Sequence, residues 1–342
     1  MQWEIGIDMG TSGVRMAQRE NGVLFSESAA LAYYVQEKQP FAWGDDARAL
    51  TGRTPASVRL RAPMKGGVLE NSQAARFWLQ HMTKQAAEAH RNRRGTVLMS
   101  YTAGSRAAHE EALMRAALEA GAAEVGIVRS DVAGAIGAGL DVLAPGAVFV
   151  LEIGAGHITS SIVTMGRIAA EGSIPYGFDR INEQFMRNLV AERGFAVGEL
   201  TAEDIKCELG AAENIEHSAG VRMTVQGFDL RTRMPRSEVI KPADICRVIE
   251  PVIAEITFML NGMISQIPEE LAADLIDAGV TVIGGGAHLP GLDRAIGEAL
   301  QIPCFIAEDP ENAVVRGLSE ILRRSNHFDT LVTDRMARSG RG

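Results

Sequence analysis

The stretch EIGIDMGTSGVRMA at residues 4–17 decides the fold, because a second stretch of the same design, AVFVLEIGAGHITSSIVT, occurs at residues 147–164. The first stretch alternates like a half-buried strand up to Asp8, turns on glycines and becomes extended again. In the second, an apolar run leads to Glu152, a glycine turn follows and a second extended run continues. A unit of strand, acid, glycine turn and strand therefore occurs twice, with Glu152 standing 144 residues after Asp8.

The chain between and after the two copies alternates between helical and extended patterns. A helix that Ser105 could cap is predicted over 105–120, a strand over 124–128 and a helix of small residues over 132–139. Apolar residues then keep helical spacing up to Gly194, and a β-branched strand is predicted over 281–283. Such alternation predicts an α/β protein with two domains and mixed or parallel sheets.

The composition excludes several classes of function. The 342 residues are 46% apolar and 23% charged, with a net charge of −9, so we expect no nucleic-acid partner. The three cysteines, Cys207, Cys246 and Cys304, lack the spacing of a zinc site and are typical of a reducing compartment. Without a leader-like segment or a long apolar run, we expect a cytoplasmic protein.

The glycine turns are candidate phosphate-binding loops. Backbone amides can approach a phosphate closely where glycine replaces a side chain, and a nearby hydroxyl adds a donor. A single turn of this kind is most often a plain loop, but its duplication favours phosphate binding. The acid before each turn, Asp8 or Glu152, could hold Mg²⁺ through water. The candidate residues are Gly10, Thr11, Ser12 and Gly13 in the first turn, Gly154, Ala155 and Gly156 in the second, and Gly284, Gly285, Gly286 and Ala287 in a third glycine set.

These motifs resemble those of the actin-like ATPase superfamily and, over residues 3–322, those of the MreB-type bacterial actin homologues. The stretches that carry the resemblance are IDMGT at 7–11, GRTP at 52–55, GVL at 67–69, AGAIGAGL at 133–140, TAEDIK at 201–206, PEELAAD at 268–274 and GGGAHLPGL at 284–292. The resemblance implies an actin-like fold, with two domains that each contain an RNase-H-like sheet and a nucleotide cleft between them. It also implies ATP and Mg²⁺ as ligands and self-assembly into protofilaments.

The resemblance further implies a division of the chain and a role for each motif. Domain I would span 1–143 with a small subdomain at 30–65, domain II would span 144–322 with a small subdomain at 180–241, and 323–342 would be a flexible tail. The first turn would bind the β-phosphate side and the second the γ-phosphate side. Glu203 and Lys206 would contact the ribose and base. Taken alone, Lys206 is better explained as a solvated helix residue paired with Glu203 or Asp204, and only its place in the TAEDIK motif favours the site role. Residues 285–287 would close over the adenosine.

Three departures from the family pattern affect function. Residues 129–131 read RSD where MreB proteins carry Glu-Glu-Pro, so Asp131 is the remaining catalytic candidate and we expect slow hydrolysis. Glu152 replaces an aspartate, and His157 interrupts the usual Gly-Gly-Gly-Thr-Thr, where it either contacts a phosphate or is simply exposed. The candidate membrane loop, EAHRNRR at 88–94, could touch anionic lipid headgroups or be a solvated turn.

The sequence leaves two classes of function open. The first is an MreB-like cytoskeletal protein that binds ATP and Mg²⁺ and polymerises with itself, serving cell shape or an internal scaffold together with partner proteins. The alternative is a non-polymerising actin-fold adaptor of the PilM or EutJ kind, which binds nucleotide to recruit a partner. A small-molecule kinase ranks last, because no stretch indicates a sugar site.

Overall fold

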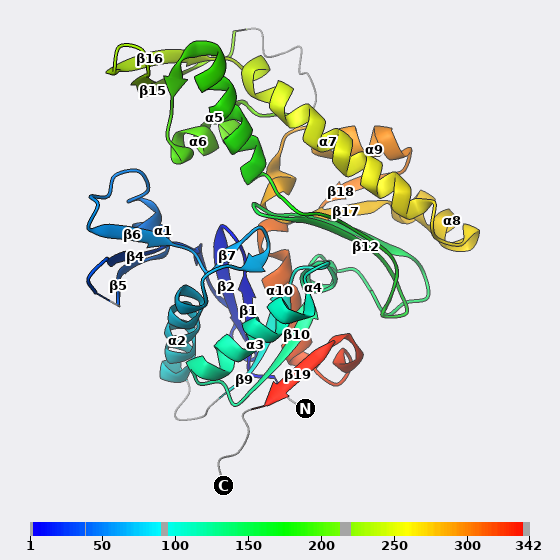
Figure 1. Ribbon diagram of the computed structural model, residues 1–342. Coiled ribbons are helices and arrows are strands. Elements are labelled where there is room, and N and C mark those ends of the chain that lie inside the picture. The colour runs from blue at the N-terminus through cyan, green and yellow to red at the C-terminus, as the bar shows by residue number, and fades with distance from the viewer. Residues whose placement is uncertain (1–2, 38, 90–94, 213–219, 338–342) are drawn as a thin grey trace.

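The structure, a computed structural model, describes residues 3–37, 39–89, 95–212 and 220–337 and contains two large sheets (Figure 1). The first sheet has the strand order β19-β10-β9-β1-β2-β3. Its strands are β1 (Ile5–Met9), β2 (Gly13–Gln18), β3 (Gly22–Ser28), β9 (Thr96–Tyr101), β10 (Glu124–Arg129) and β19 (Asp334–Ala337). The second sheet has the order β13-β12-β11-β17-β18. Its strands are β11 (Val148–Ile153), β12 (Ile158–Thr164), β13 (Arg167–Ile174), β17 (Val280–Ile283) and β18 (Cys304–Ile306).

The two sheets share one topology, as the duplicated sequence unit predicts. In the first, β1 runs antiparallel to β2 and parallel to β9, and β2 continues antiparallel to β3. In the second, β11 runs antiparallel to β12 and parallel to β17, and β12 continues antiparallel to β13. The register places Asp8 opposite Arg15 in one copy and Glu152 opposite Thr159 in the other. The prediction of two α/β halves built on the same unit is confirmed.

Two helices pack closely together between the sheets (Figure 1). They are α4 (Ser130–Gly137) and α10 (Ala313–Arg323). Their backbones touch at two glycines: a Cβ atom at Gly317 would lie 1.7 Å from the Ala133 carbonyl oxygen, and one at Gly137 would lie 1.8 Å from that of Ala313. Apolar side chains of both helices and both sheets form one buried cluster here. The two halves therefore share a core.

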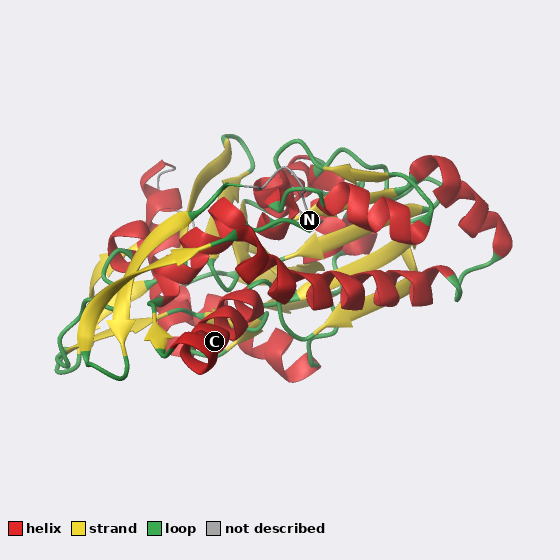
Figure 2. Cartoon of the chain, turned by 90° about the horizontal axis from the view of Figure 1, so that it is seen from above, coloured by secondary structure: helices red, strands yellow, loops and turns green. Residues whose placement is uncertain are grey.

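Helices flank the strands of both large sheets (Figure 2). On the first sheet these are α2 (Ser72–Ala89) and α3 (Ala107–Ala120); on the second they are α7 (Pro242–Ile264), α8 (Glu269–Ala278) and α9 (Leu292–Leu300). Helices α5 (Asp179–Arg193) and α6 (Glu199–Leu209) pack on each other and on α7. The N-cap of α3 is Arg106, not Ser105, because the Ser105 hydroxyl instead donates to Glu110 at 2.8 Å. No helix in the described part of the chain combines the length and apolarity that crossing a membrane requires.

Smaller sheets lie within the ranges expected for the small subdomains. Strands β4 (Leu31–Tyr34), β5 (Pro40–Trp43) and β6 (Val58–Arg61) form one of them beside α1 (Gly44–Arg48). Strands β14 (Phe195–Ala196), β15 (Met223–Asp229) and β16 (Met234–Ile240) form the other. A short hairpin of β7 (Met64–Lys65) and β8 (Val68–Leu69) follows the first small sheet and contributes to the site.

The structure differs from the expected flexible tail over residues 323–337. Strand β19 pairs antiparallel with β10, and Phe328 and Leu331 are buried in the shared core. Helix α10 itself packs on β1 and β2, although its residues fall in the range expected for domain II. The end of the chain therefore returns to the first sheet, because its apolar residues and unpaired strand edge both find partners there. Residues 338–342, and residues 90–94 of the candidate membrane loop, lie outside the described residues.

Candidate functional site

The two glycine turns are hairpin tips closed by the same hydrogen bond. In the first, the Gly10 N–H donates to the Gly13 carbonyl at 2.8 Å. In the second, the Gly154 N–H donates to the His157 carbonyl at 2.9 Å. Both tips therefore present short, glycine-rich backbone at the corresponding end of their sheets, where amides can approach a phosphate closely.

The two tips meet in space. A Cβ atom at Gly156 would lie 2.3 Å from the Thr11 hydroxyl oxygen, so the second hairpin passes directly against the first. The turn between β7 and β8 joins them, since the Gly67 N–H donates to the Thr11 hydroxyl at 3.3 Å. The same turn touches the second hairpin, because a Cβ atom at Gly67 would lie 2.9 Å from that of His157. Residues from both halves of the chain thus converge on one place.

Each of the two predicted acids is oriented by hydroxyl groups. The Ser100 hydroxyl donates to Asp8 at 2.7 Å. The Ser130 and Thr159 hydroxyls donate to Glu152 at 2.6 and 3.4 Å. Burial, together with the negative charges of Asp8 and Asp131, raises the pKa of Glu152 to about 8 despite these hydrogen bonds. A nearby cation would therefore favour the ionised form of this half-buried carboxyl group.

Arg15 connects the first hairpin to the turn that contains Glu311 and Asn312. The sequence analysis did not identify Arg15 as a site residue. Its guanidinium lies 3.6 Å from Asp8 and 2.9 Å from Glu311, and its Nε donates to Asn312 at 3.2 Å. The signal was present, because an arginine inside a buried strand pattern requires charged or polar partners. The turn that holds Glu311 is the 3₁₀ helix η3 (Pro310–Asn312).

The third glycine set lies against the second hairpin strand. Gly284 has φ +87°, and its N–H donates to the Pro310 carbonyl at 2.7 Å. Cβ atoms at Gly284 and Gly286 would collide with Ile153, at 2.5 Å from its carbonyl oxygen and 2.2 Å from its Cγ2. A Cβ atom at Gly285 would meet no described atom within 4 Å, at the start of η2 (Gly285–His288). Packing explains two of the three glycines, and the third leaves room for a ligand.

Glu203 and Lys206 also lie beside the second hairpin, through the start of α5. The N–H groups of Phe178 and Asp179 donate to the Gly154 and Ala155 carbonyls at 3.0 and 2.9 Å. Lys206 in turn donates to the Phe178 carbonyl at 3.4 Å. Lys206, near the end of α6, is thus connected to the second hairpin tip through the backbone of Phe178.

Lys206 is not a solvated helix residue. It is 9% exposed and donates to Glu203 at 2.8 Å, while Asn182 donates to the same carboxylate at 2.5 Å. Burial favours the neutral form of Glu203, but the charge and hydrogen bonds of Lys206 outweigh it and lower the pKa. At neighbouring Asp179, burial is stronger than the attraction of Lys206 and raises the pKa to about 6. The pairing considered from sequence is present, in a buried setting.

Residues 129–131 form a charged cluster between the two halves. Asp131 is fully buried and accepts hydrogen bonds from Arg129 at 2.8 and 3.1 Å and from Ser161 at 2.5 Å. It also accepts from the neighbouring Val132 N–H in the first turn of α4, at 2.8 Å. Arg129 pairs in addition with Glu171 of β13. The carboxylate of Asp131 is thus engaged by structural partners.

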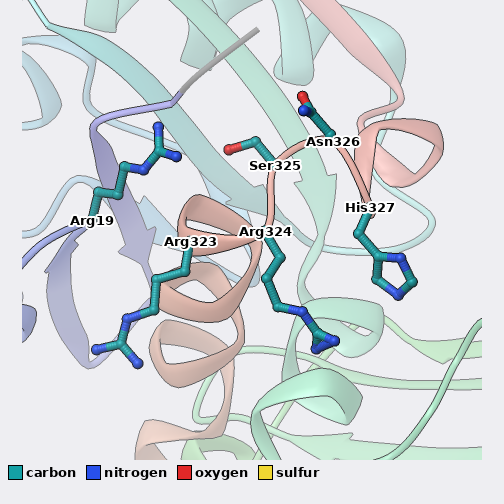
Figure 3. Close-up of a pocket in the computed structure, with 6 residues that line it drawn as sticks. All are labelled: Arg19, Arg323, Arg324, Ser325, Asn326 and His327. Atoms are coloured by element: carbon teal, nitrogen blue, oxygen red, sulfur yellow. The ribbon is translucent and has the colours of Figure 1, made fainter.

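A surface hollow at the end of α10 is separate from these motifs (Figure 3). It is lined by Arg19, Arg323, Arg324, Ser325, Asn326 and His327. The guanidinium groups point in different directions, and Arg324 is paired with Glu320. A second hollow lies on α5, around Met186 and Val190. Neither includes a predicted site residue.

Two sheets of one topology, joined through a shared core and meeting at their glycine hairpins, define an actin-like fold. The chain belongs to the MreB/Mbl family, since the family model described as MreB/Mbl protein matches residues 2–330.

Individual relatives cover almost the whole chain. The cell shape-determining protein Mbl of Bacillus subtilis is 28% identical, over 93% of this chain and 95% of its own. The cell shape-determining protein MreB of Escherichia coli is 30% identical, over 92% of this chain and 91% of its own. The crystal structure of MreB5 of Spiroplasma citri bound to ADP superposes with a TM-score of 0.88 at 27% identity, over 95% of this chain and 97% of that one.

Proposed function

We propose that this protein is an MreB-like cytoskeletal protein that binds ATP and Mg²⁺ in the cytoplasm and polymerises with itself for cell shape or an internal scaffold. The observation that carries the proposal is the convergence of two equivalent glycine hairpins, one from each half of the chain, at Thr11 and Gly156. Two further findings support it. The similar MreB5 is bound to ADP in one crystal structure and to AMPPNP in another, and Mbl and MreB are named as cell shape-determining proteins.

The site residues take roles that follow from their places. By the resemblance to MreB proteins, the tip 11–13 would hold the β-phosphate and the tip 154–156 the γ-phosphate, and the two tips approach one point from opposite halves. Glu203 and Lys206, beside the second hairpin, would contact the ribose and base. Residues 284–287 would support the adenosine, since the backbone at Gly285 faces open space. We keep residues 1–143 and 144–322 as the proposed domains, with α10 and β19 returning to the first.

Asp8 and Glu152 fit a magnesium ion held through water. Both are hard oxygen ligands, both accept from hydroxyl groups, and each stands two residues before the first glycine of its hairpin tip. Glu152 is half-buried near the negative charges of Asp8 and Asp131, which a divalent cation would offset. The ion would supply neutralisation of the phosphate charge, and these two carboxylates would orient its water ligands.

Hydrolysis should be slow in this chain. Ser130 occupies a place where MreB proteins carry a carboxylate, and its hydroxyl donates to Glu152. Asp131 is turned into the cluster with Arg129 and Ser161. A general base must come within about 2.6–3.2 Å of its water, and its loss typically costs about 10²–10⁴ in rate.

We expect Gly285→Leu to lower the affinity for ATP at least about 100-fold, because its side chain would fill the space assigned to the adenosine. Stability should not change, since a Cβ atom at Gly285 meets no described atom and the backbone φ is not left-handed. Isothermal titration calorimetry with Mg²⁺ and ATP measures the affinity, and thermal unfolding measures the stability.

Gly262→Leu is the matched control for that variant. Gly262 lies in α7, and a Cβ atom there would likewise meet no described atom within 4 Å. This variant should bind ATP like the unmodified protein. Equal ATP affinity in both variants would show that the adenosine does not lie over residues 284–287.

Assembly is tested by sedimentation of the full chain. Above a critical concentration, the pelleted fraction should rise with Mg²⁺ and ATP, and Gly285→Leu should remove the nucleotide-dependent part. A protein that binds ATP but stays monomeric over a wide range of salt and concentration would contradict polymerisation. That result would support the adaptor function instead.

A further inference from the structure

His157, at the end of the second hairpin tip, carries two polar atoms that the fold leaves unused. Both ring nitrogens are shielded from solvent, and neither has a hydrogen-bond partner among the described residues. Buried polar side-chain atoms are nearly always hydrogen-bonded, so an unpartnered pair requires an explanation. An apolar side chain of similar size would pack here at lower cost.

The surroundings of His157 come from the opposite half of the chain. A Cβ atom at Gly67 would lie 2.9 Å from His157 Cβ and 3.1 Å from both its Cγ and the Thr102 hydroxyl oxygen. Burial lowers the pKa of His157, while the Gly66 backbone, which lies near the ring but makes no hydrogen bond of good geometry with it, acts in the opposite direction. A neutral imidazole offers one N–H donor and one acceptor nitrogen. The ring therefore brings a polar donor to the point where the two halves meet.

We propose that His157 donates a hydrogen bond to the terminal phosphate of a bound nucleoside triphosphate and so determines the preference of the site for triphosphate over diphosphate. This inference rests on the proposed function, which assigns the tip 154–156 to the γ-phosphate. His157 follows that tip directly and lies against the β7–β8 turn of the first half. A phosphate oxygen would satisfy the donor that the protein leaves free.

The test compares the binding of AMPPNP and ADP, each with Mg²⁺, to the full chain. His157→Phe keeps a ring of similar size and removes both nitrogens. It should weaken AMPPNP binding about 10- to 100-fold, the loss expected for one hydrogen bond to a charged group, and change ADP binding less than about threefold. His157→Asn and His157→Gln each place an amide donor near one ring nitrogen, and one of them should recover most of the AMPPNP affinity.

The outcomes separate this inference from the proposed function. If the unmodified protein binds neither nucleotide, the proposed function fails. If it binds both and His157→Phe weakens both equally or neither, His157 has a structural role and the inference is wrong.

A measurement on the unmodified chain guards against a variant that does not fold. In protein with ¹⁵N-labelled histidine, the His157 ring signals should shift on addition of AMPPNP and stay in place with ADP. Identical shifts with both nucleotides would overturn the inference.

Discussion

Gly317→Ala is expected to destabilise the fold by more than about 4 kcal/mol, the range reached when overpacking cannot be relieved. The added methyl carbon would lie 1.7 Å from the Ala133 carbonyl oxygen and 2.5 Å from its carbon. Those atoms belong to the backbone of α4, which cannot rotate away like a flexible side chain. Helices α4 and α10 would have to separate, and the core shared by the two sheets would open.

Gly262→Ala is the matched control, since Gly262 also lies inside a helix but faces open space. Alanine there should stabilise the protein by about 0.5–1 kcal/mol through helix propensity alone. Denaturant unfolding of both variants gives the comparison. If Gly317→Ala were as stable as Gly262→Ala, the close approach of α4 and α10 would be wrong.

Arg129→Met is expected to cost about 3–5 kcal/mol of stability, the range measured when one partner of a buried ion pair is removed. Asp131 is fully buried and would keep only the Ser161 hydroxyl and the Val132 N–H as donors. The variant also loses the pair between Arg129 and Glu171, which ties β10 of one sheet to β13 of the other. Methionine retains much of the apolar volume, so the lost charge is the main change.

Two further variants make that measurement specific. Arg187→Met removes an exposed pair with Glu183 on α5, whose side chains are 58% and 60% exposed, and should change stability by less than about 1 kcal/mol. Adding Asp131→Asn to Arg129→Met removes the stranded charge and should recover part of the loss. A cost for Arg129→Met no larger than for Arg187→Met would contradict the buried cluster.

Local patterns in the sequence predicted the fold because they repeat. The acid, glycine turn and alternating strands appear twice, and a turn needs only neighbouring residues to form. The small residues of 133–140 and the glycine at 317 were visible, but their contact depends on two segments far apart in the chain. The pairing of β19 with β10 was equally hidden, since short polar strands carry little periodic signal.

The site residues also fall into two groups: some carry a local signal in the sequence, and others depend on partners from distant elements. The glycine tips were found because glycine itself is the signal, and the structure brings Thr11 and Gly156 together. Arg15 and Arg129 were not predicted as links, because their partners lie on other elements. Lys206 was ambiguous from spacing alone, and only its burial separates a solvated pair from a site residue.

The most direct test of the central claim is a crystal structure of the full chain with AMPPNP and Mg²⁺. We predict the triphosphate between the tips 10–13 and 154–157, with the metal near Asp8 and Glu152 and the adenosine over residues 284–287. Nucleotide bound elsewhere, or no nucleotide at concentrations that saturate the protein in solution, would contradict the account.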